Sequence, residues 1–464
     1  LHKAIRRQRQ MCIRDSINTG GVTPDGKDGV NAVSYLILDC MDEMKLVQPN
    51  SNVTISKKTP ARFLKRACEI SRKGWGQPAF YNTEAQIMEL VNAGKSLEDA
   101  RRGGSSGCVE TGAWGSEAYI LTGYMNIPKI FQLTLYNGYD AMSGKQLGLK
   151  LGYAKDFKTF DELWNAFKKQ MKHFIDIKIR GNNVIERLYA ENMPAPCLSV
   201  VTNDCISNAK DYNAGGARYN TNYIQGVGIG TVTDCIAAVK YNVYDKKNFT
   251  MEELIEAMDH NFEGYDAIYR MVHDKTPKYG NDDDYADDLM QDVFYLYHDL
   301  ITGRPTMRGG KYGVDMLPTT CHVYFGDVIG ATANGRKAHI PVSEGISPEK
   351  SADVNGPTAA ANSVSRLDHF IVSNGTLFNQ KFHPSALAGR EGLEKFVALI
   401  RGYFDQKGMH MQFNVVDRET LLDAQKHPEK YKHLVVRVAG YSALFTTLSR
   451  SLQDDIIRRT EQGF

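Results

Sequence analysis

Two short loops, far apart in the sequence, carry residue types suited to chemistry. The first loop, residues 105 to 112, reads SSGCVETG and places Cys108 directly after Gly107, with Glu110 two residues later. Glycine lets this backbone turn tightly and lets a ligand approach. A nearby negative charge raises the pKa of a thiol, so a carboxylate beside Cys108 opposes thiolate chemistry. The pair suits instead a neutral S–H group that exchanges hydrogen atoms, with Glu110 handling protons.

A structural interpretation of the first loop competes with this chemical one. Buried, inert cysteine is common, and Glu110 would then be an ordinary solvated side chain. The second loop, residues 437 to 443, reads RVAGYSA and places Gly440 before Tyr441. Taken alone, it predicts a strand that ends in a glycine turn, which is a frequent arrangement. Each loop by itself therefore leaves the function open.

Taken together, the two loops resemble the signature of the glycyl radical enzymes. RVAGYSA resembles the carboxyl-terminal glycine motif of that family, and the GCVE of residues 107 to 110 resembles its cysteine loop. Two distant motifs in the right order are far more specific than one short motif. Three intervening stretches also resemble the family: DYNAGGARYN at 211–220, ANGR at 333–336 and PVSEGISP at 341–348. The resemblance covers residues 17 to 464.

The resemblance implies that Gly440 stores a radical and that Cys108 attacks the substrate as a thiyl, with Glu110 as the third catalytic residue. A radical on glycine Cα is delocalised over the flanking amides, and planarity there is possible only without a Cβ. The implied fold is α/β: the carboxyl-terminal portion of a ten-stranded β/α barrel of the pyruvate formate-lyase-like type, with the two loops meeting at its centre.

The resemblance also implies cofactors and partners. The glycyl radical on Gly440 would be a post-translational modification made by a separate radical S-adenosylmethionine activating enzyme, which supplies the S-adenosylmethionine and an iron–sulfur cluster. This chain lacks clustered cysteines for such a cluster, so no metal is expected in it. A homodimer, a small-molecule substrate and an oxygen-free cytoplasm are implied as well.

Details of the loops narrow the expected reaction. Formate C-acetyltransferases use adjacent cysteines, whereas this chain has Gly107 before Cys108. EAYILTGY at 117–124 and LPTTCHVYFG at 317–326 resemble the members that remove water from trans-4-hydroxy-L-proline to give 1-pyrroline-5-carboxylate. That resemblance places Tyr124, and Thr319 or Thr320, beside the substrate.

Several alternatives stay open at this point. Tyr124 fits a core aromatic on a helix face equally well. A diol dehydratase is one alternative activity, although Thr122 stands near the place of an expected acidic residue. An arylacetate decarboxylase and a formate C-acetyltransferase-like enzyme are others. A small spare part that repairs a damaged partner would resemble only the Gly440 region, so the Cys108 loop argues against it.

The start of the chain differs in character from the rest. Residues 7 to 16, RQRQMCIRDS, resemble a translation of the transposon end used to prepare sequencing libraries, so residues 1–16 are expected not to be native. Residues 17–344 are expected to form a partial catalytic barrel with the cysteine loop, and 345–464 the glycyl radical domain. Since a partial barrel has open edge strands, the chain alone is expected to be inactive and prone to aggregation.

Composition and periodicity describe the scaffold that must position both loops. Hydrophobic residues make up 42% and charged residues 24%, and the net charge is +2, with both signs interspersed. This argues against a dedicated nucleic-acid binder, and no apolar run is long enough to span a membrane. Helices are expected over 61–73, 82–94, 159–190, from 250, and over 282–300, 393–404 and 451–461. Strands are expected over 198–201, 321–325 and 410–416.

Overall fold

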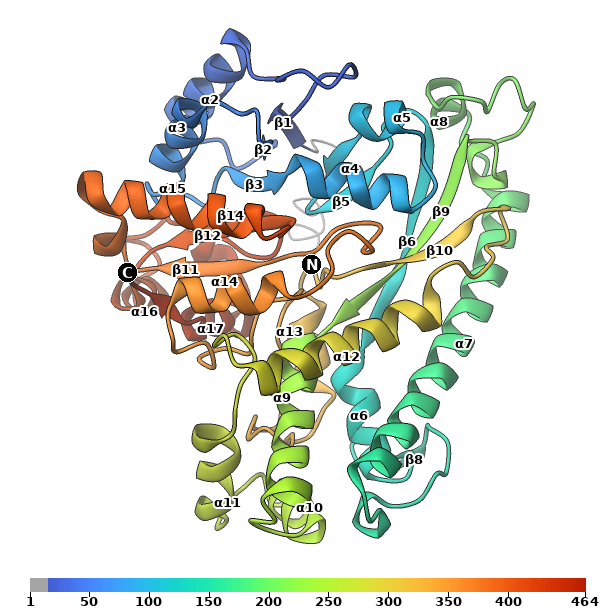
Figure 1. Ribbon diagram of the computed structural model, residues 1–464, viewed down its shortest axis with the longest axis vertical. Helices are drawn as coiled ribbons and strands as arrows, with labels where there is room; N and C mark the ends of the chain where they lie inside the picture. The colour runs from blue at the N-terminus through green and yellow to red at the C-terminus, as the bar shows by residue number, and fades with distance from the viewer. Residues whose placement is uncertain (1–15) are drawn as a thin grey trace.

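Strands from both ends of the chain lie side by side in the computed structural model, which describes residues 16–464 (Figure 1). A three-stranded and a six-stranded sheet form this row, and a parallel bridge between Met316 and Thr376 joins them. Along the row the strands are β6 (Glu117–Asn126), β9 (Tyr219–Val227), β10 (Lys311–Asp315), β11 (Asn379–Phe382), β12 (His410–Val415), β3 (Ala79–Asn82), β2 (Asn50–Ile55) and β1 (Ser16–Gly20). The sixth strand of the larger sheet, β15 (Glu461–Gln462), pairs in parallel with β11 alone.

The strands fall into two parallel groups of opposite direction. Strands β6, β9, β10, β11 and β12 run parallel to one another, and so do β3, β2 and β1. The groups meet at an antiparallel pair between β12 and β3. The structure thus has the expected α/β class. Among the described residues β6 and β1 end the row, so a closed ten-stranded barrel stays a prediction.

Helices pack on the strands and extend beyond them. In Figure 1, helices α6, α9, α10 and α11 (Asp266–Arg270) reach below the strands, and α7 runs along one side. The longer helices are α2 (Ala32–Met44), α3 (Ala61–Ser71), α4 (Thr83–Asn92), α6 (Ile127–Leu135), α7 (Phe160–Asn192), α9 (Ile229–Val239), α10 (Met251–Asp259), α12 (Asp284–Ile301), α14 (Pro357–Ser365), α15 (Gly389–Asp405), α16 (Arg418–Lys426) and α17 (Arg450–Arg458).

Three of the predicted helix starts are confirmed by their caps. The side chains of Asn82, Thr159 and Thr250 accept backbone N–H bonds at the first turns of α4, α7 and α10, as the sequence predicts. Helix α3 differs from these three, because Pro60 occupies its cap position without a side-chain bond and the hydroxyl of Thr59 accepts the Ser56 N–H.

Two predicted strands are helices. Residues 198–201 lie in α8 (Pro196–Val201), and 321–325 lie in α13 (Cys321–Asp327). Both runs are short and rich in β-branched or aromatic residues, which periodicity cannot distinguish from helix. A proline at the start of α8 favours the first helical turn. Tyr124, considered above for a helix face, lies instead in strand β6.

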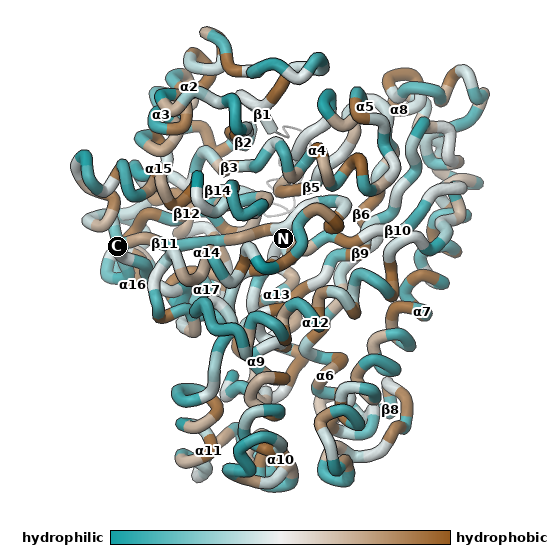
Figure 2. The backbone as a smooth tube through the Cα atoms, viewed as in Figure 1, coloured by the Kyte–Doolittle hydropathy of each residue, from teal (hydrophilic) through white to brown (hydrophobic). Residues whose placement is uncertain are grey.

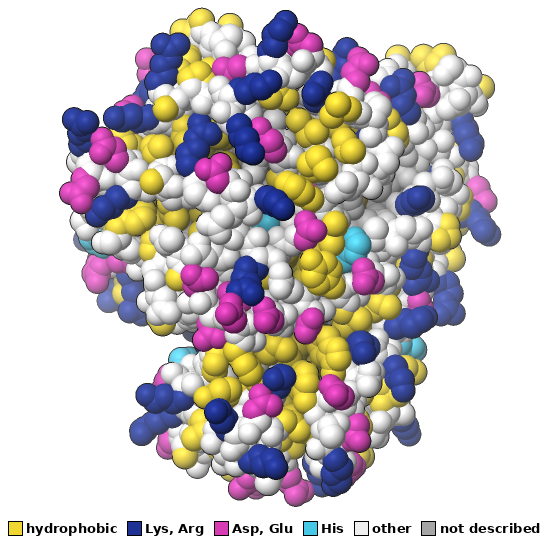
Figure 3. Space-filling view, in the orientation of Figure 1, with side chains coloured by type: hydrophobic (Ala, Val, Ile, Leu, Met, Phe, Trp, Pro, Cys, Tyr) yellow, Lys and Arg dark blue, Asp and Glu magenta, His cyan; other side chains and the backbone are white. Residues whose placement is uncertain are grey.

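Two large hydrophobic clusters make up most of the interior of residues 16–464, beside two small ones. The larger fills the space between strands and helices, and the smaller surrounds Cys108 and includes Leu317 and Val438. Figure 2 shows hydrophobic segments where β6 and β9 cross the middle of the molecule, and alternating character along α7. On the face in Figure 3, basic and acidic side chains are interspersed. Within residues 16–464, no helix combines the length and apolarity that a membrane crossing needs.

Residues 1–16, which are expected not to be native, lie almost wholly outside the residues that the structure describes. Residues 1–15 are not among the described residues, and Ser16 begins β1, where it pairs with Asn50. The boundary expected at residue 17 therefore stays a prediction.

Candidate active site

The cysteine loop, residues 105 to 112, is a tight turn between two short strands. Strands β4 (Gly104–Ser106) and β5 (Glu110–Gly112) pair antiparallel and hold Cys108 at the turn. Gly107 has φ of +64°, and a Cβ there would lie 2.9 Å from Oε2 of Glu110. The left-handed backbone and the close carboxylate both explain why glycine precedes the cysteine.

Glu110 closes this loop upon itself. Its Oε2 accepts the backbone N–H groups of Cys108, at 2.6 Å, and of Val109, at 2.9 Å. Two amide donors stabilise an ionised carboxylate. The side chain is buried, and this position keeps the carboxyl group beside the backbone of Cys108. The proximity expected from the sequence is present in the structure.

The glycine hairpin, residues 435 to 444, presents Gly440 at its tip. Strands β13 (Val435–Arg437) and β14 (Ser442–Leu444) pair antiparallel, and the N–H of Val438 donates to the carbonyl of Tyr441 at 2.8 Å. Gly440 has φ of +82°, in the left-handed region. The strand and glycine turn predicted for this segment are therefore present.

The two loops touch at Cys108 and Gly440, which lie 332 positions apart in the sequence. A Cβ placed on Gly440 would lie 2.0 Å from the Cβ and 2.6 Å from the Sγ of Cys108. Real Cβ atoms essentially never come so close, so only glycine fits here. The hydrogen-bearing Cα of Gly440 therefore faces the sulfur, and a hydrogen atom can pass between them with little movement.

A small set of buried amide side chains fixes the tip of the hairpin. Gln412 accepts the N–H of Gly440 at 3.2 Å and the Nε–H of Arg437 at 2.8 Å, both through Oε1. Asn50 donates from Nδ2 to the carbonyls of Gly440 and Gly107, each at 3.2 Å. Asn50 thus joins the two loops directly.

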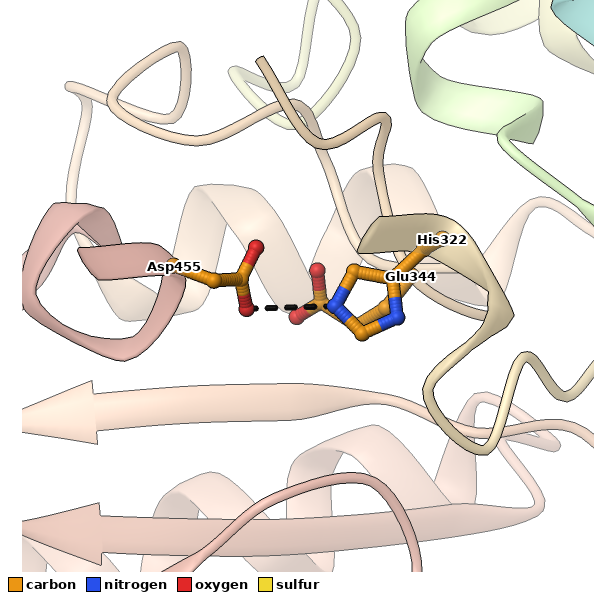
Figure 4. A group of neighbouring side chains, drawn as sticks. All are labelled: His322, Glu344 and Asp455. Carbon is orange, nitrogen blue, oxygen red and sulfur yellow. Dashed lines mark hydrogen bonds and ion pairs between the residues drawn. The ribbon is translucent and has the colours of Figure 1, made fainter. Parts of the chain in front are cut away.

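Arg459 holds the hairpin from the other side. It donates to the carbonyls of Arg437, at 3.2 Å, and Val438, at 2.8 Å. Its own charge lies among buried groups of α13, α17 and the loop after residue 341, where His322, Glu344 and Asp455 converge (Figure 4). The C-terminal helix α17 therefore positions the backbone just before Gly440.

The cluster in Figure 4 is an ion-pair network rather than a metal site. The Nε2 of His322 lies 3.2 Å from Oδ2 of Asp455. Lys350 Nζ lies 3.2 Å from Glu344 and 3.0 Å from Asp455, between the two carboxylates, where it would repel a metal cation. Burial opposes ionisation of Asp455, but Lys350 and His322 outweigh it and hold its pKa well below the usual value.

Tyr124 and Thr319 lie together, as the resemblance implies. The hydroxyl groups of Tyr124 and Thr319 are 2.8 Å apart, and burial raises the pKa of Tyr124, so its hydroxyl stays protonated. Thr319 has φ of +51°, a strained backbone for a β-branched residue. Thr320 stands at the start of α13 without a side-chain capping bond. The geometry thus favours Thr319 over Thr320.

Sequence inspection missed the residues that position the loops: Tyr81, which donates to the Cys108 carbonyl, and Asn50, Gln412 and Arg459. One signal was available. In the run HMQFNV of β12, every residue is buried although residues 410, 412 and 414 are polar. A strand with a buried polar face indicates a site on that face.

Comparison with known proteins agrees with this geometry. The family profile described as "Pyruvate formate lyase-like" matches residues 13–326, and that described as "Glycine radical" matches residues 342–446. The trans-4-hydroxy-L-proline dehydratase of Clostridioides difficile is 63% identical over 97% of this chain and 57% of its own length. The (2S)-3-sulfopropanediol dehydratase of Klebsiella oxytoca is 35% identical over 97% of this chain and 55% of its own length.

Solved structures of dehydratases are also similar to this chain. The hydroxyproline dehydratase of Clostridioides difficile, with trans-4-hydroxy-L-proline bound, superposes with a TM-score of 0.95 at 63% identity, covering 97% of this chain and 57% of that one. The B12-independent glycerol dehydratase of Clostridium butyricum superposes with a TM-score of 0.93 at 44% identity, with the same coverage. The chain thus spans a little over half the length of these relatives, and it belongs to the pyruvate formate-lyase-like glycyl radical enzymes.

Proposed function

We propose that the protein is a glycyl radical dehydratase that removes water from trans-4-hydroxy-L-proline to give 1-pyrroline-5-carboxylate. The contact between Gly440 and Cys108 carries the radical chemistry, because it lets one hydrogen atom pass between storage and attack. The 63% identity to a trans-4-hydroxy-L-proline dehydratase supports the substrate. Residues 17–344 would be the catalytic part and 345–464 the radical domain.

The proposed mechanism assigns one task to each residue. A radical on Gly440 takes the hydrogen atom from the Cys108 thiol. The Cys108 thiyl takes hydrogen from the ring carbon between the amine and the carbinol carbon. Glu110 exchanges the proton that accompanies loss of the neighbouring hydroxyl as water, help that typically contributes about two to four orders of magnitude in rate. The thiol then returns its hydrogen atom to the carbon radical that remains after water has left, which gives the product. The resulting Cys108 thiyl takes a hydrogen atom back from Gly440, so the radical is stored there again.

Tyr124 and Thr319 would contact the substrate. Their hydroxyl groups already form a hydrogen-bonded pair, which supports a role in binding the departing hydroxyl or in closing the pocket. Thr320 is the weaker candidate, because its side chain makes no comparable contact with Tyr124. A separate activating enzyme would introduce the radical, and a homodimer is the proposed assembly. An oxygen-free cytoplasm follows from the chemistry.

The expectation that this chain is inactive by itself gains no support from the comparisons. Both chemical loops are present in it, and they are in contact. Nor does the glycerol dehydratase similarity favour a diol substrate specifically, because that enzyme is 44% identical, against 63% for the hydroxyproline dehydratase.

The test uses the full-length protein, activated without oxygen by its cognate activating enzyme. We expect a carbon-radical electron paramagnetic resonance signal, consumption of trans-4-hydroxy-L-proline and formation of 1-pyrroline-5-carboxylate. A radical signal with turnover of glycerol but not of hydroxyproline would show that the substrate is a diol and not trans-4-hydroxy-L-proline. Absence of any radical signal with a competent activating enzyme would remove the role of Gly440.

A further inference from the structure

Three polar side chains form one row across neighbouring strands, and two of them, Gln225 and Asp315, have no role assigned above. In the pairing of the parallel strands, Tyr124 of β6 lies opposite Gln225 of β9, and Gln225 lies opposite Asp315 of β10. Paired residues of a sheet share a face, and adjacent strands lie about 4.8 Å apart. The three side chains therefore project in the same direction, side by side.

That direction is toward Cys108. Side chains alternate between the two faces of a strand. Val314 and Met316 belong to the core between strands and helices, whereas Leu317 belongs to the cluster that contains Cys108. Because Val314 and Met316 on either side of Asp315 point toward the helices, the side chain of Asp315 points the other way. It therefore lies on the same face as Leu317, two residues further on. Ile224 of β9, next to Gln225, lies in the helix-side core in the same way.

Asp315 and Gln225 are buried without hydrogen-bond partners. Asp315 is 0% and Gln225 1% exposed. Within residues 16–464, both carboxyl oxygens of Asp315 and the amide nitrogen of Gln225 lack a partner. Leaving a buried donor or acceptor unpaired costs about 1–3 kcal/mol, so most such groups in native proteins have a partner. An unpaired acceptor beside an unpaired donor, facing the cysteine loop, indicates a ligand that offers both.

The ionisable groups around Asp315 indicate the charge of the ligand. The ionisable groups that act on Asp315 are the carboxyls of Glu110 and Glu89, and burial together with these two carboxyls raises its pKa well above the usual value. Burial likewise raises the pKa of Glu89. The buried cation Lys95 is already paired with Glu117, at 2.9 Å. Tyr124 lies in the same row as Asp315, and Tyr297 lies on the helix side of the sheet. Both are neutral at pH 7 because burial raises the pKa of each. This face is therefore rich in carboxyl groups and poor in cations.

We propose that Asp315 and Gln225 form a subsite for the amine end of the substrate, in which Asp315 binds a cationic ammonium group and Gln225 donates to a neighbouring oxygen of the same molecule. This inference rests on the proposed function and deepens it. It assigns the protein to amine-bearing substrates and excludes simple diols as its preferred ligands. Binding of the ammonium group makes Asp315 ionise, so its proton leaves to solvent.

The released proton gives a readout that does not depend on turnover. Binding is measured by isothermal titration calorimetry on the unactivated full-length protein at pH 7, once in phosphate and once in Tris. These buffers differ in their enthalpy of ionisation, so the difference between the two binding enthalpies gives the number of protons that binding releases. The ligands are trans-4-hydroxy-L-proline, L-proline and glycerol. We expect both amines to bind with release approaching one proton, and glycerol to bind more weakly without release.

Variants separate Asp315 from the rest of the site. Asp315→Asn should weaken binding of both amines by about tenfold or more, which corresponds to loss of one charge-assisted contact, and should abolish the proton release. Gln225→Met keeps the size but removes the donor, so affinity should fall while proton release persists. Asp287→Asn is the matched control, because Asp287 is also buried with a pKa raised to about 7, but it lies on α12 and accepts a bond from Ser363.

The outcomes distinguish the two proposals. Equal affinity and equal proton release in wild type and Asp315→Asn would overturn the subsite and leave the proposed function standing. If wild type binds glycerol but neither amine, the proposed function is wrong, and the amine subsite with it. If Asp315→Asn fails to fold, as circular dichroism would show, Gln225→Met decides: unchanged affinity for both amines then overturns the subsite.

Discussion

The cysteine loop and the glycine hairpin are held by different means, although each contains a glycine at positive φ and the two meet at Cys108 and Gly440. The cysteine loop is closed by its own residues, since Glu110 binds the backbone of residues one and two positions away, and bonds from Tyr81 and Asn50 add to this. The glycine hairpin is held from afar, and its bond to Asn50 spans 390 positions. Cys108 thus sits on a turn that local bonds close and distant side chains support, whereas the tip that carries Gly440 is fixed mainly by distant side chains.

This difference matches the role proposed for each loop. A residue that attacks substrate needs a fixed loop that a ligand can approach. A residue that stores a radical needs exclusion from water and a single distance to its partner. Long-range contacts through Asn50, Gln412 and Arg459 supply that distance. Changes to the hairpin anchors should therefore act on stability and radical yield, while changes at the cysteine should act on turnover alone.

The largest effect is expected at Gly440. Gly440→Ala should abolish the radical signal and turnover, because the added Cβ would lie 2.0 Å from the Cβ of Cys108 and the radical centre could not become planar. Electron paramagnetic resonance after activation measures this. Gly264→Ala is the matched control: Gly264 also has φ of +82°, but nothing lies within 4 Å of the added carbon. Equal loss in both variants would show that backbone strain, not the contact, is responsible.

The next prediction distinguishes the attack on the substrate by Cys108 from the storage of the radical on Gly440. Cys108→Ser should leave the radical signal near wild-type intensity and remove turnover, since a hydroxyl gives up its hydrogen atom far less readily than a thiol. Cys197→Ser, at an exposed cysteine, should change neither. Residual turnover above about one part in a thousand would contradict the assignment of Cys108 as the attacking group.

A smaller effect is expected at the hairpin anchor. Arg459→Met removes two bonds to hairpin carbonyls and leaves Asp455 and Glu344 underpaired, so the free energy of unfolding should fall by about 3 kcal/mol. Denaturant melts measure this, and radical yield should fall as well. Arg458→Met, at the exposed neighbour, should stay within about 0.5 kcal/mol of wild type. No change in either quantity for Arg459→Met would refute the long-range anchoring of the hairpin.

The smallest effect is a pH dependence of the same anchor. The pKa of Asp455 is held well below its ordinary value of 3.8, so its contribution to stability is complete above pH 3.8 and is lost as pH falls through the folded-state pKa. Asp455→Asn should therefore be less stable than wild type at pH 7, with a deficit that shrinks below about pH 4. Melting temperatures from pH 3 to 7 measure this, with Asp454→Asn as control. A deficit independent of pH would contradict the ion-pair role.

Much of the local structure could be predicted from the sequence. Asn82, Thr159 and Thr250 are helix caps because their side chains bond to their own first turns, which depends only on nearby residues. The runs at 198–201 and 321–325 could not be assigned, since short apolar runs fit strand and helix alike. For the site, both chemical loops could be predicted as motifs, because each is a contiguous string.

The sequence by itself determined the chemistry: a glycine without Cβ, a thiol after a glycine, and a carboxylate two residues on are properties of single segments. Only the tertiary structure decided which residues make that chemistry possible. Gln412, Asn50 and Arg459 meet the Gly440 hairpin from three distant segments, and Asp315 and Gln225 meet each other through strand register. Register and long-range packing are set by the summed burial of the whole chain, so no local pattern encodes them.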